Sequence, residues 1–423
     1  MRIINTVSEI IYKKVSITLI LYILIIICNC SNHEKGEDWP VFLHDNRHSG
    51  VTAEKLDIHK LHESWVYRSS YPPQPAWSGP AKWDSYSKVY PLRSMRNYDS
   101  VFHVIVVGNS LYFGSSVEDA VICLNTKNGK EKWAYVTDGP VRIAPTFADG
   151  KIYFSSDDGF AYCLNAKDGT LIWKFKPSPD EPLIPSNGKF ISQWPCRTGV
   201  IVENGKAYFG ASLLPWKQSY LCAVDFNNGS PEGPGCYKIV LDNKTLEGAL
   251  LASSGRLFLT QGRVPPIVYD LSNGKLLGQL TGGGGVFAII TPDSRFLHGP
   301  GNKTGWITES DANTHEQIAQ YPLGNAIIAT GDMYYLLTDT SLSAAHRTTK
   351  KKVWNSKCNY PFTLILANEI LFAGGDREVA AFNSSDGEKI WAAKVEGKAY
   401  GLAAANDKLF VSTDTGAIHC FSK

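Results

Sequence analysis

The chain has 423 residues, of which 43% are hydrophobic and 12% aromatic, so it is long enough to bury a large core. Its 42 basic and 40 acidic residues leave a formal net charge of +2. The basic residues form no tract, which excludes nucleic acid and an anionic membrane surface as the main partner. We expect a globular protein that binds a neutral or locally charged ligand.

The first 30 residues differ in kind from the rest. "MRIINTVSEIIYKK" carries positive charge, and the apolar run "VSITLILYILIIIC" has the length of a signal-peptide core rather than of a membrane span. Cys30, directly after this run, resembles the lipidated cysteine of a bacterial lipobox, although Asn29 departs from the usual small residue. We predict export to the periplasm or cell envelope, with residues 1–30 as a signal peptide or lipoprotein signal. The membrane is then contacted only through this N-terminal anchor.

A repeat fills most of the remaining chain. In residues 140–176, four short apolar or β-branched runs are separated by "ADGK", "SDDG" and "AKDGT", which predicts a four-stranded antiparallel meander. The same order recurs at 111–133 and 371–391, with weaker copies between them, at a period of roughly 40 residues. We therefore predict an all-β fold: an eight-bladed β-propeller of four-stranded antiparallel blades over residues 61–423, preceded by a lead-in at 31–60.

A glycine and a tryptophan four residues apart mark the end of several units, namely Gly129 and Trp133, Gly169 and Trp173, and Gly387 and Trp391. We expect the glycine to form the last turn and the tryptophan to pack from the outer strand between neighbouring blades. The last unit stops after its third strand. Residues 61–70 have the same terminal tryptophan, Trp65, and are predicted to supply the missing outer strand and close the ring.

The cysteines follow the repeat. Cys123, Cys163, Cys222 and Cys420 hold the same place in different units, which puts them out of bridging range and predicts small buried hydrophobes. Cys196, Cys236 and Cys358 are unassigned, and one bridge among them stays open. The sequence has no haem-attachment motif and no cluster with metal-ligand spacing, so no cofactor and no metal are predicted.

The repeat signature "CLNAKDGTLIW" and the lead-in "DWPVFLHDNRHSG" resemble those of bacterial PQQ-like β-propellers. With "PAWSGPAKWDSYS" and "GPGNKTGW", the chain is similar to an exported subgroup found in planctomycete-type bacteria. The superfamily includes quinoprotein alcohol dehydrogenases and the propeller lipoprotein of the outer-membrane assembly machinery. The resemblance implies the propeller fold and admits PQQ with Ca²⁺ as an alternative. However, the vicinal cysteine pair of many such dehydrogenases is absent from this chain.

The loops on one face of the predicted propeller are varied, whereas those on the other face are monotonous. Arg142 and Arg197 lie at matching offsets before the innermost strands of adjacent units, so both should point to the mouth of the central channel on the varied face. With Arg263 and Lys303 in nearby loops, they would suit a carboxylate, sulfate or phosphate. The alternative is that each arginine pairs with loop carbonyls or a buried aspartate.

Aromatic side chains also gather on the varied face. The insertion at 71–100 is rich in proline and aromatic residues, and its Trp83, together with Trp194 and Trp216, could stack on sugar rings. In the alternative, the insertion is a lid whose aromatics fill a small core of its own. His103 and His298 are candidate acid/base groups on this side, against the alternative of hydrogen-bonded structural histidines.

From these features we expect a monomeric exported scaffold, not an enzyme, that binds an envelope protein or an anionic or carbohydrate ligand on its varied face. Two alternatives remain open. One is a carbohydrate-active hydrolase or lyase that uses the same face, and the other is a PQQ-dependent dehydrogenase.

Overall fold

A computed structural model of the chain describes residues 36–77, 98–179, 182–260, 264–282, 287–299 and 306–423. Within these ranges every regular element is a β-strand. They include no helix long and apolar enough to cross a membrane. The chain divides into a unit at residues 1–36 and a compact unit at residues 37–423, and the fold described below is that of the second unit.

The strands form eight blades, which we number in chain order. Blade 1 consists of β3 (Val104–Val107), β4 (Ser110–Ser115), β5 (Ala120–Asn125) and β6 (Glu131–Val136). Blade 2 consists of β7 (Thr146–Ala148), β8 (Lys151–Ser155), β9 (Ala161–Asn165) and β10 (Leu171–Phe175). Blade 3 consists of β13 (Ile201–Glu203), β14 (Lys206–Ala211), β15 (Ser219–Asp225) and β16 (Tyr237–Leu241). Blade 4 consists of β17 (Leu251–Ser253), β18 (Arg256–Leu259), β19 (Ile267–Asp270) and β20 (Leu276–Gln279). Blade 5 consists of β21 (Phe287–Ile290), β22 (Arg295–Gly299), β23 (Ile307–Asp311) and β24 (Gln317–Tyr321). Blade 6 consists of β25 (Gly324–Ala329), β26 (Met333–Thr338), β27 (Ser341–His346) and β28 (Lys352–Lys357).

The last two blades share a strand. Blade 7 contains β29 (Thr363–Ala367), β30 (Ile370–Gly374), β31 (Asp376–Asn383) and the first part of β32 (Lys389–Ala405), and blade 8 contains the second part of β32, β33 (Lys408–Thr413), β34 (Ala417–Ser422) and β2 (His62–Arg68). Two further elements lie outside this pattern: β1 (Val51–Thr52), which pairs in parallel with β29, and the hairpin of β11 (Leu183–Ser186) and β12 (Lys189–Ser192).

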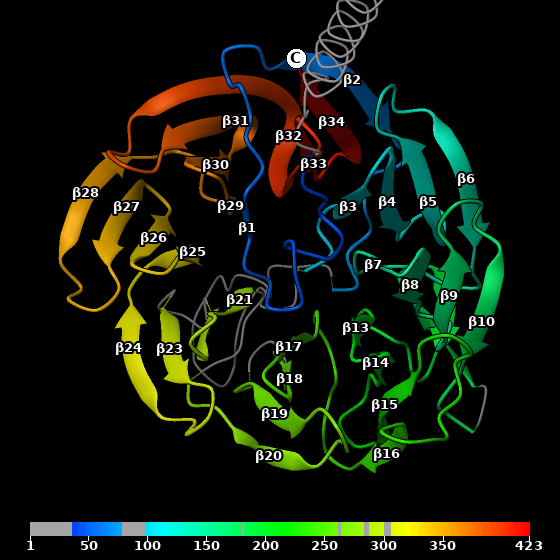
Figure 1. Cartoon of the computed structure of the whole chain (residues 1–423). Helices are drawn as coiled ribbons and strands as arrows, with labels where there is room; N and C mark the ends of the chain where they lie inside the picture. The colour runs from blue at the N-terminus through cyan, green and yellow to red at the C-terminus, as the bar shows by residue number, and fades with distance from the viewer. Residues whose placement is uncertain (1–35, 78–97, 180–181, 261–263, 283–286, 300–305) are drawn as a thin grey trace, which may run out of the picture. The chain divides into compact units, whose positions relative to one another are not determined.

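The blades form a closed ring. The inner strands β3, β7, β13, β17 and β21 contact one another in that order. Blade 5 then contacts β25, which is followed by β29 and β32, and β32 contacts β3 again. Figure 1 shows the blades around a common centre, with β1 running through it. The predicted eight-bladed propeller is therefore confirmed, and so is its closure, because β2 pairs antiparallel with β34 from His62 to Arg68.

Burial follows the position of each strand in its blade. The third strand β9 is buried along most of its length, whereas the outer strand β10 is largely exposed. Inner strands have blades on both faces and read as continuous apolar runs, while the outer strand meets solvent along its edge. The buried strand β9 accordingly has the sequence "AYCLN", and the largely exposed strand β10 has the sequence "LIWKF".

The predicted packing of tryptophan between blades is present at several seams. A Cβ added to Gly129, Gly169, Gly229 or Gly387 would lie within 2.5–2.7 Å of the indole of Trp65, Trp133, Trp173 or Trp354, respectively, on the preceding blade. Each indole Nε1 also donates to a carbonyl in that same turn, at 3.0–3.3 Å. Only glycine allows this approach, and its positive φ suits the turn.

Two seams on the far side of the ring are built differently. Between blades 4 and 5, the glycine lies on the outer strand and the ring lies in the turn: His315 packs on Gly278 of β20. Between blades 5 and 6, Lys350 replaces the turn glycine, and its ammonium donates to the buried Glu309 carboxylate at 3.0 Å. The hydroxyls of Tyr321 and Tyr334 donate to the same carboxylate at 2.6 and 2.7 Å.

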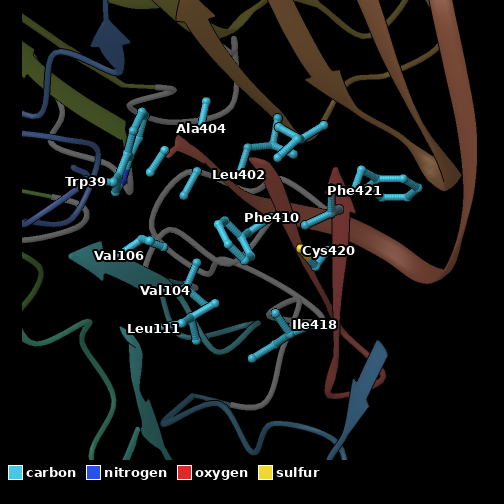
Figure 2. Close-up of a cluster of buried hydrophobic side chains, with 14 of the residues drawn as sticks. Trp39, Val104, Val106, Leu111, Leu402, Ala404, Phe410, Ile418, Cys420 and Phe421 are labelled. Carbon is cyan, nitrogen blue, oxygen red and sulfur yellow. The ribbon is translucent and has the colours of Figure 1, made fainter. Parts of the chain in front are cut away.

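The largest buried cluster joins blades 7, 8 and 1 to the lead-in. Figure 2 shows Trp39 of the lead-in together with Val106 of β3 and Phe410 of β33. The repeated cysteines Cys123, Cys163, Cys222 and Cys420 are fully buried, as predicted. All seven cysteines of the described ranges are free thiols, so the bridge left open among Cys196, Cys236 and Cys358 does not form here.

Candidate functional site: a closed channel beneath a varied face

A segment of the lead-in closes one end of the central channel. It runs from Val41 to Gly50, and we call it the strap. One end is fixed by Trp39, whose backbone exchanges two hydrogen bonds with Val106 of blade 1, and the other by β1 on blade 7. The strap therefore lies across the ends of the inner strands.

Backbone hydrogen bonds attach the strap to blade after blade. The amides of Ala252 and Ile290, at the inner strands of blades 4 and 5, donate to the carbonyls of Asn46 and Arg47 at 2.8 and 2.9 Å. Leu366 of blade 7 donates to Gly50 in the same way, and the Asn46 side chain donates to Val202 O of blade 3. Each of these groups would otherwise be an unsatisfied inner-strand donor or acceptor, so the strap completes the ring.

Above the strap lies a cavity of about 20 Å³. Phe42 and His48 of the strap line it from below, and Tyr98 and His103, which precede blade 1, line it from another side. Other lining residues lie just before β7 and β17, just after β18, and on β21. A cavity of this size has room for a water-sized molecule. Burial lowers the pKa of both His48 and His103 to about 4, so both rings are neutral near pH 7.

A buried ion-pair network joins blades 2 and 3 to the segment before blade 1. Asp157, in the loop after β8, accepts from Arg197 Nε at 2.9 Å and Nη2 at 2.8 Å, and from Arg142 Nε at 2.7 Å. Arg142 Nη1 also donates to Asp99 at 2.9 Å and to the carbonyl of Gln74 at 2.7 Å. The side chains of both arginines are at most 2% exposed.

The two carboxylates of this network respond differently to burial. Burial opposes ionisation of Asp157, but the charges of Arg197 and Arg142 outweigh it, so its pKa lies below the ordinary value. For Asp99, burial dominates over Arg142 and raises the pKa. The arginines are thus neutralised internally, which matches the alternative of pairing with a buried aspartate.

The hairpin β11–β12 lies over this network. Its turn, Asn187-Gly188, has positive φ at both positions, as a two-residue hairpin turn of this type requires. Asn187 Nδ2 donates to the carbonyls of Pro75 and Ala76, next to the Gln74 that holds Arg142. Lys189 Nζ reaches across to blade 1 and donates to Val117 O at 2.9 Å and to Asp119 at 2.5 Å.

The varied face carries large apolar side chains in solvent. On the hairpin, Leu183 is 61% and Phe190 68% exposed, and Pro185 lies opposite Phe190 in the register. The neighbouring loop of blade 3 places Trp216 at 73% exposure. This loop is tied to the hairpin's base, because Trp194 Nε1 donates to Gln218 O at 2.7 Å. The hairpin and this loop, residues 183–192 and 212–218, are named the apolar patch below.

The structure separates the residues proposed from sequence. Trp83, Arg263, Lys303 and Cys30 lie outside the described residues, so their predicted roles stay predictions. Arg142 and Arg197 do come together, but both are buried. Trp194 is also buried. His298 is fully buried in β22, whereas His103 lines the cavity. Trp216 alone of the described set presents its ring to solvent.

Sequence reasoning missed two parts of this arrangement. The hairpin lies in a stretch interpreted only as a long link, although "LIPSNGKFIS" carries the Asn-Gly signal of a two-residue turn. The strap was described only as a lead-in. Nothing in its sequence indicates the inner-strand partners, because they are spread over distant blades.

The cavity above the strap does not fit PQQ with Ca²⁺. A fused tricyclic quinone needs a flat pocket far larger than the water-sized cavity, whose lower side the strap occupies. Ca²⁺ needs six to eight oxygen ligands. No group of three or more His, Cys, Asp or Glu residues in the described ranges is placed to hold a metal.

Comparisons with known proteins agree with the architecture. The model of a family described as "Outer membrane protein assembly factor BamB" matches residues 78–231, which is less than half of the chain. A tetrathionate hydrolase from Acidithiobacillus ferrooxidans is 41% identical over 54 residues. This match covers 12% of this chain and 11% of that protein, so the chain spans only about a tenth of the relative's length.

Two solved structures are similar over most of the chain. A quinohemoprotein alcohol dehydrogenase from Comamonas testosteroni has a TM-score of 0.64 at 13% identity, covering 91% of this chain and 81% of that one. BamB from Moraxella catarrhalis has a TM-score of 0.56 at 14% identity, covering 86% and 100%. At such identities the likeness shows the fold alone. Repeat, ring and comparisons together define the chain as an eight-bladed β-propeller protein whose repeats are similar to PQQ-like repeats.

Proposed function

We propose that the protein is an exported, non-catalytic scaffold of the cell envelope that holds a protein partner on its apolar patch. The observation that carries the proposal is the exposure of Trp216, Phe190 and Leu183 on loops that polar contacts fix in place. Rigid, exposed aromatic side chains are the usual anchors of protein interfaces.

The small interior cavity favours a scaffold over an enzyme. The strap lies along inner strands of blades 3, 4, 5 and 7, and the cavity above it is lined mostly by uncharged residues. Substrate pockets usually also contain accessible polar groups. Export rests on the N-terminal apolar run, and a family named for an outer-membrane assembly factor is consistent with it.

A second candidate is a carbohydrate ligand, which the exposed ring of Trp216 favours, because indoles stack on sugar faces. A ligand of this kind needs polar groups beside the ring, and Lys217 and Gln218 are exposed there. The carbohydrate-active enzyme is the catalytic version of this candidate.

A photo-crosslinking amino acid placed at Phe190 or Trp216 in cells tests the proposal. The control site is Ile172, an exposed apolar position on the outer strand β10. We expect one protein adduct from both patch sites, none from Ile172, and loss of the Trp216 adduct when Phe190→Ser is added. Equal adducts from all three sites, or none, would contradict a protein partner. Binding of the purified protein to a glycan array, abolished by Trp216→Ala, would favour the second candidate instead.

A further inference from the structure

The strap has an unusual backbone. Leu43, His44 and His48 all have positive φ, at 52°, 84° and 55°. Residues other than glycine adopt this conformation in only a few per cent of cases, although histidine does so more often than leucine. Three such residues in one short loop indicate stored strain. Strain of this kind is typical of segments that change conformation.

Two imidazoles contact the strap, the buried His48 and the partly buried His103. Phe42 packs edge-on against His48, with ring centroids 5.1 Å apart, and against His103 at 4.8 Å. Both histidines line the cavity above the strap. Phe42 therefore lies between a histidine of its own segment and one from the segment before blade 1.

Backbone hydrogen bonds at Ala288 and Leu250 and the charge of Asp45 favour a charged His48 ring, but burial outweighs them. From the strap, Asp45 faces His48, but its carboxylate already accepts from the Arg47 and Ser49 amides and the Arg47 guanidinium. From the segment before blade 1, Tyr98 and His103 are the titratable groups at the cavity, and His103 contacts the Tyr98 backbone. Blades 2, 4 and 5 contribute uncharged residues such as Ile143, Thr260 and Ala288.

We propose that the strap is an acid-released closure of the central channel. Neutral His48 and His103 keep Phe42 seated, and protonation of either ring releases the strap between its two fixed ends while the blades stay folded. The channel then opens at the strap end.

The size of the effect follows from proton linkage. The closed form lowers the pKa of both histidines to about 4, whereas a released imidazole titrates near 6.5. The closed form thus binds fewer protons than the released form. Its advantage in free energy is therefore complete above pH 6.5 and is lost as the pH falls toward 4. Between pH 7 and pH 5 the released population rises roughly 20-fold per histidine.

Hydrogen–deuterium exchange of the whole protein at pH 7 and pH 5, corrected for intrinsic exchange, measures this release. The amides of Ala252 and Ile290 report it, because they donate to Asn46 and Arg47 of the strap. We expect their protection factors to fall at least 20-fold, while amides within β15 of blade 3 keep theirs. Asparagine tolerates the left-handed backbone and cannot be protonated, so His48→Asn with His103→Asn should abolish the pH dependence. The exposed control His346→Asn should retain it.

Three results would overturn the proposal. The first is unchanged protection of Ala252 and Ile290 in the wild-type protein, a measurement that needs no variant. The second is a loss shared equally by β15, which would show general destabilisation. The third is a pH dependence that persists in the folded double variant His48→Asn with His103→Asn.

Discussion

The indole of Trp65 covers Gly129 across the seam that closes the ring. Trp65 lies on β2, which precedes all other blade strands in the sequence, and Gly129 lies in the last turn of blade 1. A Cβ at Gly129 would lie 2.6 Å from the ring, and Trp65 Nε1 donates to Thr126 O at 3.0 Å. The closing seam therefore uses the same contact as seams formed within the repeats.

Gly129→Ala should destabilise the protein by about 2–5 kcal/mol, because it adds a steric clash to the left-handed backbone. Gly150→Ala is the matched control: its φ is +71°, but nothing lies within 4 Å of the added Cβ. The control should lose only about 1–2 kcal/mol. Urea unfolding compares the two, and equal losses would contradict the packing explanation.

Asp157→Asn should destabilise the protein by about 3–5 kcal/mol, because it leaves two buried guanidiniums without their shared carboxylate. The comparison is Asp293→Asn, which removes the exposed partner of Arg347 and should change stability by about 0–1 kcal/mol. Both values come from denaturant unfolding at pH 7. If Asp157→Asn were as mild as Asp293→Asn, the buried network would have no structural role.

The seam between blades 5 and 6 should weaken in acid. Burial opposes ionisation of Glu309, but hydrogen bonds from Tyr321, Tyr334 and Lys350 outweigh it and lower its pKa below the usual 4.5. Stability from such a carboxylate is complete above the usual value and is lost as the pH falls through the lowered one.

Glu309→Gln should therefore be less stable than the wild type by about 1–3 kcal/mol at pH 7, and the difference should shrink below pH 4. Chemical unfolding at pH 7 and pH 3.5 measures this, with the exposed Glu316→Gln as control. A difference that stays constant with pH would show that the ionised form is not what matters.

Thiol labelling should separate the cysteines. Burial raises the pKa of Cys123 to about 11 and of Cys420 to about 12, and both side chains are inaccessible. Cys236 is partly exposed in a turn of blade 3. Iodoacetamide at pH 8 followed by peptide mass spectrometry should modify Cys236 in the folded protein at least tenfold faster. Comparable rates would indicate that the blades open on the labelling timescale.

Periodic features of the sequence predicted the fold well, and single side chains explain why. Trp133 and Gly169 signal a blade seam because their spacing recurs, and Trp65 predicted ring closure because the last unit lacks an outer strand. The matching offset of Arg142 and Arg197 predicted that the two side chains point the same way, and both do bind Asp157. Their burial depends on Asp99 and Gln74, which belong to a non-repeating segment. The seam of Lys350 and Glu309 was missed because it replaces the periodic residues altogether.

The pairing of β2 with β34 has a consequence for biogenesis. It joins Ser64 to Ser422, residues 358 positions apart, through their hydroxyls at 2.6 Å. During synthesis from the N-terminus, the strand of Trp65 emerges first and finds its partner only when β34 has been made. Until then blade 8 lacks its outer strand and β2 is an open edge, which exposes the nascent chain to mispairing. Synthesis of β34 is thus the event that commits the ring to its native state.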